Sequence, residues 1–322
     1  MRFSVDPWDP AYGTSLDTEL GASTAEVDVD VELPAGRWRP LAPPPAVLPP
    51  AVVRFVDGVR RVDAQVWVDE PDGSASPALC ASYAAGVVCC CAPDGAHLID
   101  ARVQRGLFTT AVAGADIVTA AGTYAATHTA ALPDKPPMQT LSLALQRSLA
   151  ATELLSALGA GEGHGPCGPD ELTVVDGPLP RQPLPCAIGF IKSHRDTYLP
   201  TALGGIVATL GDGERTPVFR LSRSLGRPWQ RYTWYLRLPT AGGAPWAGVV
   251  RVECGPDLEA DRAVALAGIS QVTLVRFAST EYKDSRAPQN LYPIAGLERA
   301  LRRRLGEPAV LYRALRRAAA AA

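Results

Sequence analysis

Two apolar runs that each stop at an aspartate constrain the fold of this chain more than any other feature. The run Leu172–Val175 stops at Asp176, and the run Val52–Val56 stops at Asp57; a glycine follows each acid. β-branched residues favour an extended backbone, and glycine and proline end strands. Both runs therefore predict buried strands that end in a carboxylate, and two such carboxylates are candidates to converge on a cation. Because Asp-Gly is also a common turn dipeptide, a plain turn at Asp57 stays an open alternative.

Composition limits the classes of protein to consider. The chain has 322 residues, enough for one large domain or two ordinary ones. Its hydrophobic content of 47% and charged content of 20% are typical of a globular core. The net charge of −2 gives no global support for nucleic-acid binding, which would need a local basic surface.

Cellular location also follows from sequence patterns. The seven cysteines, which include Cys89-Cys90-Cys91, are interpreted as small buried hydrophobes in a reducing cytoplasm. No signal peptide is evident, and no apolar run reaches the roughly 18 residues that a membrane span needs. His164 and Cys167 have no second pair of soft ligands at suitable spacing, so no zinc site is predicted there.

The order of expected elements predicts an α/β fold, with residues 1–50 as a proline-rich extension and residues 51–322 as the body. Besides the run ending at Asp176, strands are expected at Val52–Asp57, Val59–Val68, Ala81–Ala92, His97–Thr109, Pro185–Ile191, Pro217–Leu221, Arg231–Leu238, Gly248–Glu253 and Ser270–Ser279. Helices are expected at Met138–Leu158, Leu258–Ala267, Leu291–Leu305 and Ala309–Ala320. The extension carries Trp8, Tyr12 and Trp38, large aromatics that are expected to anchor on a partner subunit or motor.

Carboxylates in this pattern suit phosphodiester hydrolysis with divalent metal ions. That chemistry needs acids that hold two cations about 3.5–4 Å apart, and magnesium and manganese prefer oxygen ligands. Asp57 and Asp176 supply two acids, and Glu153, near the apolar stripe of its predicted helix, supplies a third. A helix-edge glutamate that pairs with Arg147 or faces water is the alternative reading of Glu153.

Polar residues near the C-terminus and basic residues after the predicted strands complete the candidate site. Asp284, Asn290 and, less directly, Glu298 lie where a strand end leads into a long helix, although capping or turn roles remain open. The candidates for phosphate contacts and single-strand binding are Lys192, His194, Arg195 and Arg231. A solvated strand face is the alternative for the basic residues.

Taken in order, these segments resemble the NurA nuclease family over roughly residues 50–305. The resemblance is carried by Asp57-Gly58, Glu153, Val-Val-Asp-Gly-Pro-Leu at 174–179, Gly-Phe-Ile-Lys-Ser at 189–193 and Arg-Ala-Pro-Gln-Asn-Leu-Tyr-Pro-Ile at 286–294. It implies an RNase H-like mixed sheet flanked by helices and a DNA nuclease that uses Mn²⁺ or Mg²⁺. It also implies a homodimer that works with a HerA-like hexameric ATPase in DNA-end resection or phage defence. Asp57, Glu153 and Asp176 match the family's metal-binding acids.

One departure from the family keeps other functions open. Many members carry a histidine in or near the last catalytic helix, whereas all four histidines of this chain lie upstream. Either Asp284, Asn290 or Glu298 replaces that histidine, with Asp284 as the fourth catalytic candidate, or the site is weakened. A non-catalytic adaptor that docks on the motor is therefore a second hypothesis. An Argonaute-like nuclease is a third, which the short chain disfavours.

Overall fold

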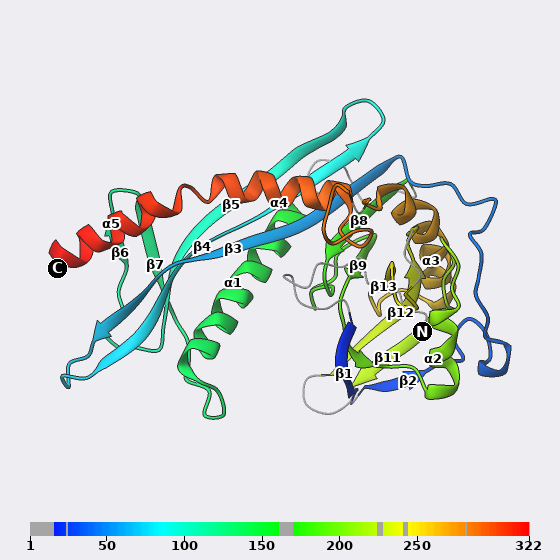
Figure 1. The fold of residues 1–322 in the computed structure, drawn as a ribbon, viewed down its shortest axis with the longest axis horizontal. Helices are drawn as coiled ribbons and strands as arrows, with labels where there is room; N and C mark the ends of the chain where they lie inside the picture. Colours follow the sequence, from blue (N-terminus) through cyan, green and yellow to red (C-terminus); the bar gives the residue numbers. More distant parts are fainter. Residues whose placement is uncertain are drawn as a thin grey trace, which may run out of the picture. The chain divides into compact units, whose positions relative to one another are not determined.

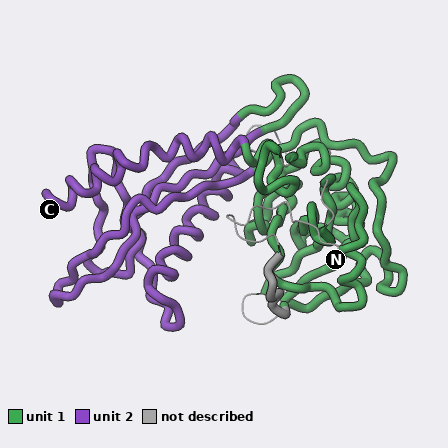
Figure 2. The backbone as a smooth tube through the Cα atoms, in the orientation of Figure 1, with its two compact units in different colours: residues 1–55, 89–97, 164–295 green, residues 56–88, 98–163, 296–322 purple. Residues whose placement is uncertain are grey.

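The chain folds into two compact units. The computed structural model describes residues 16–23, 25–160, 170–223, 228–240, 244–280 and 282–321, with the side chains of residues 16–22 and 195 left out (Figure 1). Unit 1 comprises residues 1–55, 89–97 and 164–295, and unit 2 comprises residues 56–88, 98–163 and 296–322 (Figure 2). A prolonged strand, β3, contributes residues to both units.

The secondary structure is a mixture of long strands and helices. The strands are β1 Leu16–Ala22, β2 Glu26–Asp28, β3 Val52–Asp69, β4 Ala75–Cys91, β5 Gly95–Thr109, β6 Ile117–Thr119, β7 Gly122–His128, β8 Glu171–Asp176, β9 Ala187–Ile191, β10 His194–Thr197, β11 Phe219–Arg223, β12 Trp229–Arg237 and β13 Val249–Cys254. The α-helices are α1 Pro137–Gly159, α2 Thr201–Ala208, α3 Ala260–Leu274, α4 Tyr292–Arg304 and α5 Pro308–Ala321. Of the helices described, none combines the length and apolar character needed to cross a membrane.

Unit 2 is a three-layer sandwich built on the order β3-β4-β5-β7-β6. Side chains alternate across a strand, so β4 buries a different set on each face. Leu79 packs with Leu145 of α1 on one face, whereas Cys80 packs with Leu315 of α5 on the other. The helical spacing of the leucines in α1 and the proline at its start explain why this helix was predictable from the sequence.

Unit 1 is built on the order β2-β11-β12-β13-β9-β8-β3. Strands β8 and β9 are parallel, whereas β9, β13, β12, β11 and β2 pair antiparallel in turn. Helix α3 contacts β12, where the Trp234 indole donates a hydrogen bond to the Ser270 hydroxyl at 3.1 Å. The predicted mixed α/β sheet flanked by helices is thus confirmed at this coarse level.

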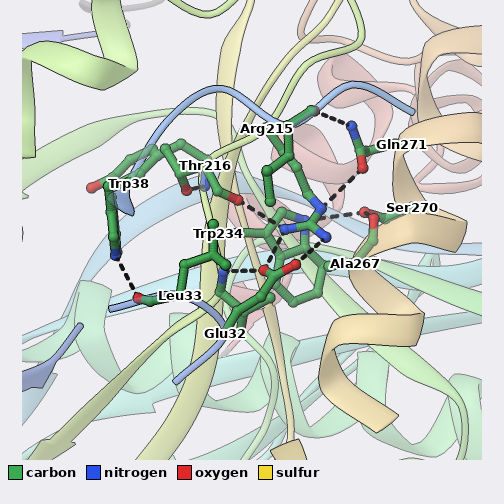
Figure 3. A network of polar contacts seen from close by, with 12 residues as sticks. Glu32, Leu33, Trp38, Arg215, Thr216, Trp234, Ala267, Ser270 and Gln271 are labelled. Carbon is green, nitrogen blue, oxygen red and sulfur yellow. Dashed lines mark hydrogen bonds and ion pairs between the residues drawn. The ribbon is translucent and has the colours of Figure 1, made fainter. Parts of the chain in front are cut away.

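The segment before β3 is part of the core of unit 1, so the predicted boundary at residue 50 differs from the structure. Trp38 is 8% exposed and packs with Phe219. Glu32 accepts two hydrogen bonds from the guanidinium of Arg215, at 2.6 and 2.9 Å, and Arg215 also donates to Gln271 at 2.9 Å (Figure 3). The large aromatic side chain is anchored within its own chain; Trp8 and Tyr12 lie outside the described residues.

Three local predictions were wrong for identifiable reasons. Asp57-Gly58 does not end a strand, because β3 runs unbroken through it. The predicted strand Ser270–Ser279 is the end of α3 followed by a 3₁₀ turn, since Ala263, Ala267 and Leu274 are buried at helical spacing. The cysteines are not all small buried hydrophobes, as predicted. Cys80 and Cys254 are free and buried, whereas Cys186 is disulfide-bonded.

Candidate metal and phosphate site

In unit 1, the strand that ends in Asp176 has the predicted form. β8 runs parallel to β9 with Asp176 opposite Phe190, and the chain leaves the sheet at Gly177. Gly177 has φ +102°, a backbone conformation that side chains with a Cβ rarely adopt, so the Asp-Gly pair ends the strand here. Asp176 and Lys192 therefore emerge from neighbouring parallel strands at the same edge of the sheet.

A chain of polar contacts joins four of the predicted site residues. The Lys192 ammonium lies 2.6 Å from a carboxylate oxygen of Asp176 and donates to the Asn290 side-chain carbonyl at 3.0 Å. The Asn290 amide in turn donates to Asp284 at 2.7 Å. Asn290 is fully buried, so these contacts fix its orientation. Asp284 and Asn290 thus act together as supports for Lys192.

Asp176 and Lys192 border an open cavity of about 460 Å³. Tyr198 and Arg251 also line it; the Arg251 guanidinium stacks 4.9 Å over the Tyr198 ring and donates to Glu253 at 2.9 Å. Glu253 lies between two guanidinium groups, 2.9 Å from Arg251 and 3.7 Å from Arg231. The Lys192 ammonium is held between Asp176 and Asn290 beside this cavity, where it is placed to contact a phosphate oxygen.

In unit 2, Asp57 meets Glu298 of α4. Their carboxylate oxygens lie within 4.8 Å of each other, close enough to share one cation. Alternation along β3 places Asp57 on the same face as Arg61, which donates to the carbonyl of Gly306 just after α4 at 2.8 Å. The side chain of Glu298 is 13% exposed, and its contact with Arg302 is long, at 4.0 Å. The sequence favoured Glu298 less than the other candidate acids, yet its carboxylate lies close to that of Asp57.

Glu153 lies on the opposite face of β3. A Cβ built on Gly58 would collide with the Glu153 carboxylate and lie 2.6 Å from the Leu149 side chain, so α1 packs directly on this glycine. Since neighbouring residues of a strand point to opposite faces, the Asp57 side chain projects away from α1. Glu153 therefore contacts β3 from the side of α1, whereas the Glu298 carboxylate lies close to that of Asp57.

Two predicted phosphate contacts are buried and bind backbone carbonyls of unit 1. His194 is 6% exposed and its ring contacts the carbonyl of Val249 at 3.1 Å; burial lowers its pKa to about 4, so the ring is neutral near pH 7. Arg231 is 9% exposed and donates to the carbonyl of Pro180 at 2.9 Å. The side chain of Arg195 lies outside the described residues.

The sequence reasoning missed Arg251, although a signal was present. Arg251 and Glu253 alternate with valines in β13, and charges inside an apolar strand indicate a paired and functional setting. Comparison of the chain with protein-family models found no match, and a search of curated proteins found no similar sequence.

Proposed function

We propose that the protein is a DNA nuclease that depends on Mn²⁺ or Mg²⁺, with Asp57, Glu298 and Asp176 as the metal-binding acids. The observation that supports this most is the pair of carboxylates, Asp57 and Glu298, whose oxygens lie within 4.8 Å in unit 2. Two carboxylates at this separation repel each other, and a cation relieves that repulsion. Oxygen ligands of this kind suit magnesium and manganese.

The proposed fold of this nuclease is an RNase H-like core. Strands β3, β4 and β5 follow each other in the chain, the short strands β6 and β7 precede helix α1, and β8 and β9 then extend the sheet beyond β3. Asp57 lies on β3 and Asp176 ends β8, and these two strands are neighbours in the hydrogen-bonded order.

The residues of unit 1 suit the handling of a phosphate. Bound metal ions in such sites activate a water molecule and stabilise the leaving oxygen. Lys192 would contact a non-bridging phosphate oxygen from the edge of the cavity, held in place by Asn290, which Asp284 orients. The stacked Tyr198–Arg251 pair would form the wall against which the backbone of the substrate lies.

The proposed partners follow from the same interpretation. A homodimer that works in the cytoplasm with a HerA-like hexameric ATPase would place nuclease sites at DNA ends, in end resection or in phage defence. Residues 26–41 pair and pack within unit 1. The dimer and motor contacts are therefore proposed to lie outside this stretch of residues 1–50 or elsewhere in the chain.

Cleavage assays on linear single- and double-stranded DNA test the metal-binding acids. Asp57→Asn, Glu298→Gln and Asp176→Asn should each reduce the Mn²⁺-dependent rate by more than about 100-fold, since even outer-shell partners of metal ligands are worth about 10–100-fold. Binding of DNA should persist. The matched control is Glu153→Gln, which should cleave at close to the wild-type rate because Glu153 lies on the other face of β3.

The outcomes of this assay are distinct. Wild-type cleavage by Asp57→Asn and Glu298→Gln would refute the assignment of those acids. A Glu153→Gln variant as inactive as Asp57→Asn would restore the grouping that the sequence predicted. Comparison of the variants also requires matching thermal unfolding curves, so that lost activity is not lost folding.

One observation favours the adaptor as a second candidate function. The Lys192 ammonium already neutralises Asp176 at 2.6 Å, so that carboxylate has a cationic partner without a metal ion. A docking subunit with a structural ion pair would show the same contact. If the wild-type chain cleaves no DNA with Mn²⁺ or Mg²⁺, either alone or with a HerA-type ATPase, the adaptor is the correct function.

A further inference from the structure

The turn between β4 and β5 gathers three metal-binding side chains away from the carboxylates. Cys89 and Cys91 lie near the end of β4, and His97 follows the start of β5. One ligand atom from each of the three lies within 4.8 Å of the other two. All three belong to unit 1, in the stretch 89–97. The sequence interpretation, which treated these cysteines only as buried hydrophobes, did not detect the cluster.

The backbone of the hairpin creates this arrangement. Cys89 and Cys91 are two residues apart in an extended strand, so their side chains share a face, and Cys90 points to the opposite one. The chain reverses through Ala92–Asp94, and Gly95 takes φ +62°, which glycine accommodates without strain. His97 then returns beside the two thiols. The ligand positions are set by backbone geometry.

The three side chains form a donor set for a borderline-soft cation. Thiolate and imidazole suit zinc, whereas magnesium and manganese prefer the oxygen ligands of the acids described above. Tetrahedral zinc with bonds of about 2.0–2.3 Å places its ligand atoms about 3.6–3.8 Å apart, and the 4.8 Å limit includes that spacing. Two thiolates cancel the charge of Zn²⁺, which suits a partly buried location.

A backbone carbonyl orients the histidine of this cluster. A ring nitrogen of His97, Nδ1, lies 3.3 Å from the carbonyl of Gly95. Because a carbonyl only accepts hydrogen bonds, Nδ1 donates there and Nε2 is the nitrogen left for a metal, the usual support for a zinc-binding histidine. The Asp94 carboxylate lies 4.0 Å from the Cys91 sulfur but outside the group of mutually close ligand atoms.

We propose that Cys89, Cys91 and His97 bind one zinc ion that fastens the β4–β5 turn. The site is independent of the proposed nuclease centre, and it differs from that centre in ligand chemistry. Its three protein ligands come from both strands that flank the turn, so a bound zinc ion would tie the end of β4 to the start of β5. Zinc binding should therefore stabilise the folded chain.

Cobalt substitution of the full-length protein tests the proposal. The protein is stripped with a chelator, kept reduced with a phosphine, and titrated with Co²⁺. The wild type should bind one equivalent with a thiolate-to-cobalt charge-transfer band, and Zn²⁺ should displace that band. Cys91→Ser and His97→Ala should each weaken the binding that produces the band by at least about 10-fold. Cys90→Ser is the matched control and should retain it.

Each outcome decides the proposal. Absence of the band in the wild type overturns it, as does an equal band in wild type and Cys91→Ser. Loss of the band in Cys90→Ser together with its survival in Cys91→Ser would move the thiolate site to the other face of β4 and also overturn it. His97→Ala alters a partly exposed side chain, so it keeps the test valid if a cysteine variant fails to fold. Cobalt held by Asp57 and Glu298 gives no thiolate band, so this result is separate from the fate of the nuclease proposal.

Discussion

At the scale of single residues, the buried imidazole of His194 couples folding to pH. Its pKa is about 4 in the folded chain, mainly through burial and further through the positive charge of Arg251, against about 6.5 for an exposed histidine. Between these values the unfolded chain binds a proton that the folded chain does not. The free energy of unfolding therefore falls as pH drops from about 6.5 to about 4, by about 3 kcal/mol in total.

Urea unfolding at about pH 7 and at about pH 4.5 checks this prediction. His194→Gln should show a smaller loss of stability between the two pH values than the wild type, because the variant has no group there to protonate. Carboxylates titrate in both proteins, so their contribution cancels in the comparison. His128→Gln, at a more exposed histidine, serves as the control. Identical pH dependence in wild type and His194→Gln would show that the imidazole protonates freely in the folded state.

At the scale of elements, the contact of α1 with β3 depends on the missing side chain of Gly58. Gly58→Ala should lower the free energy of unfolding by about 1–3 kcal/mol, because the new methyl group would overlap Glu153 and Leu149. Gly204→Ala in α2 is the matched control, since nothing lies within 4 Å of a Cβ there, and it should be neutral or stabilising by about 0.4–1 kcal/mol. Midpoints of urea unfolding measure both. A Gly58→Ala variant as stable as wild type would contradict the packing of α1 on β3.

The same contact explains which elements were predictable from the sequence. The strand ending at Asp176 was predictable because a β-branched run and Gly-Pro act locally. Helices α1, α4 and α5 followed from apolar spacing. Asp57-Gly58 was wrongly predicted to end a strand. The glycine is required there because α1, about 90 residues away, packs directly on it, and no turn is involved. The sequence could not rank Glu298 above Glu153 as a neighbour of Asp57 for a related reason. Which helix covers which face of β3 depends on tertiary packing.

At the scale of the whole molecule, the N-terminal segment predicts how truncation affects stability. A chain that starts at Ala51 lacks Trp38 and Glu32, which contribute to the core and to the buried network around Arg215. Removing one partner of a buried ion pair costs about 3–5 kcal/mol, and lost aromatic burial adds to it. The truncated chain should therefore unfold at a much lower temperature and expose apolar surface. Calorimetry measures the unfolding temperature, and binding of a fluorescent dye to apolar surface measures the exposure. A truncated chain as stable as the full one would show that residues 1–50 are a dispensable extension.

The distribution of the chain between the two units has an evolutionary consequence. Six segments alternate between unit 1 and unit 2, so the backbone passes from one unit to the other five times, once inside β3 itself. Recombination at a single gene junction could neither add nor remove one unit intact. We therefore expect the two units to be inherited together rather than exchanged as modules.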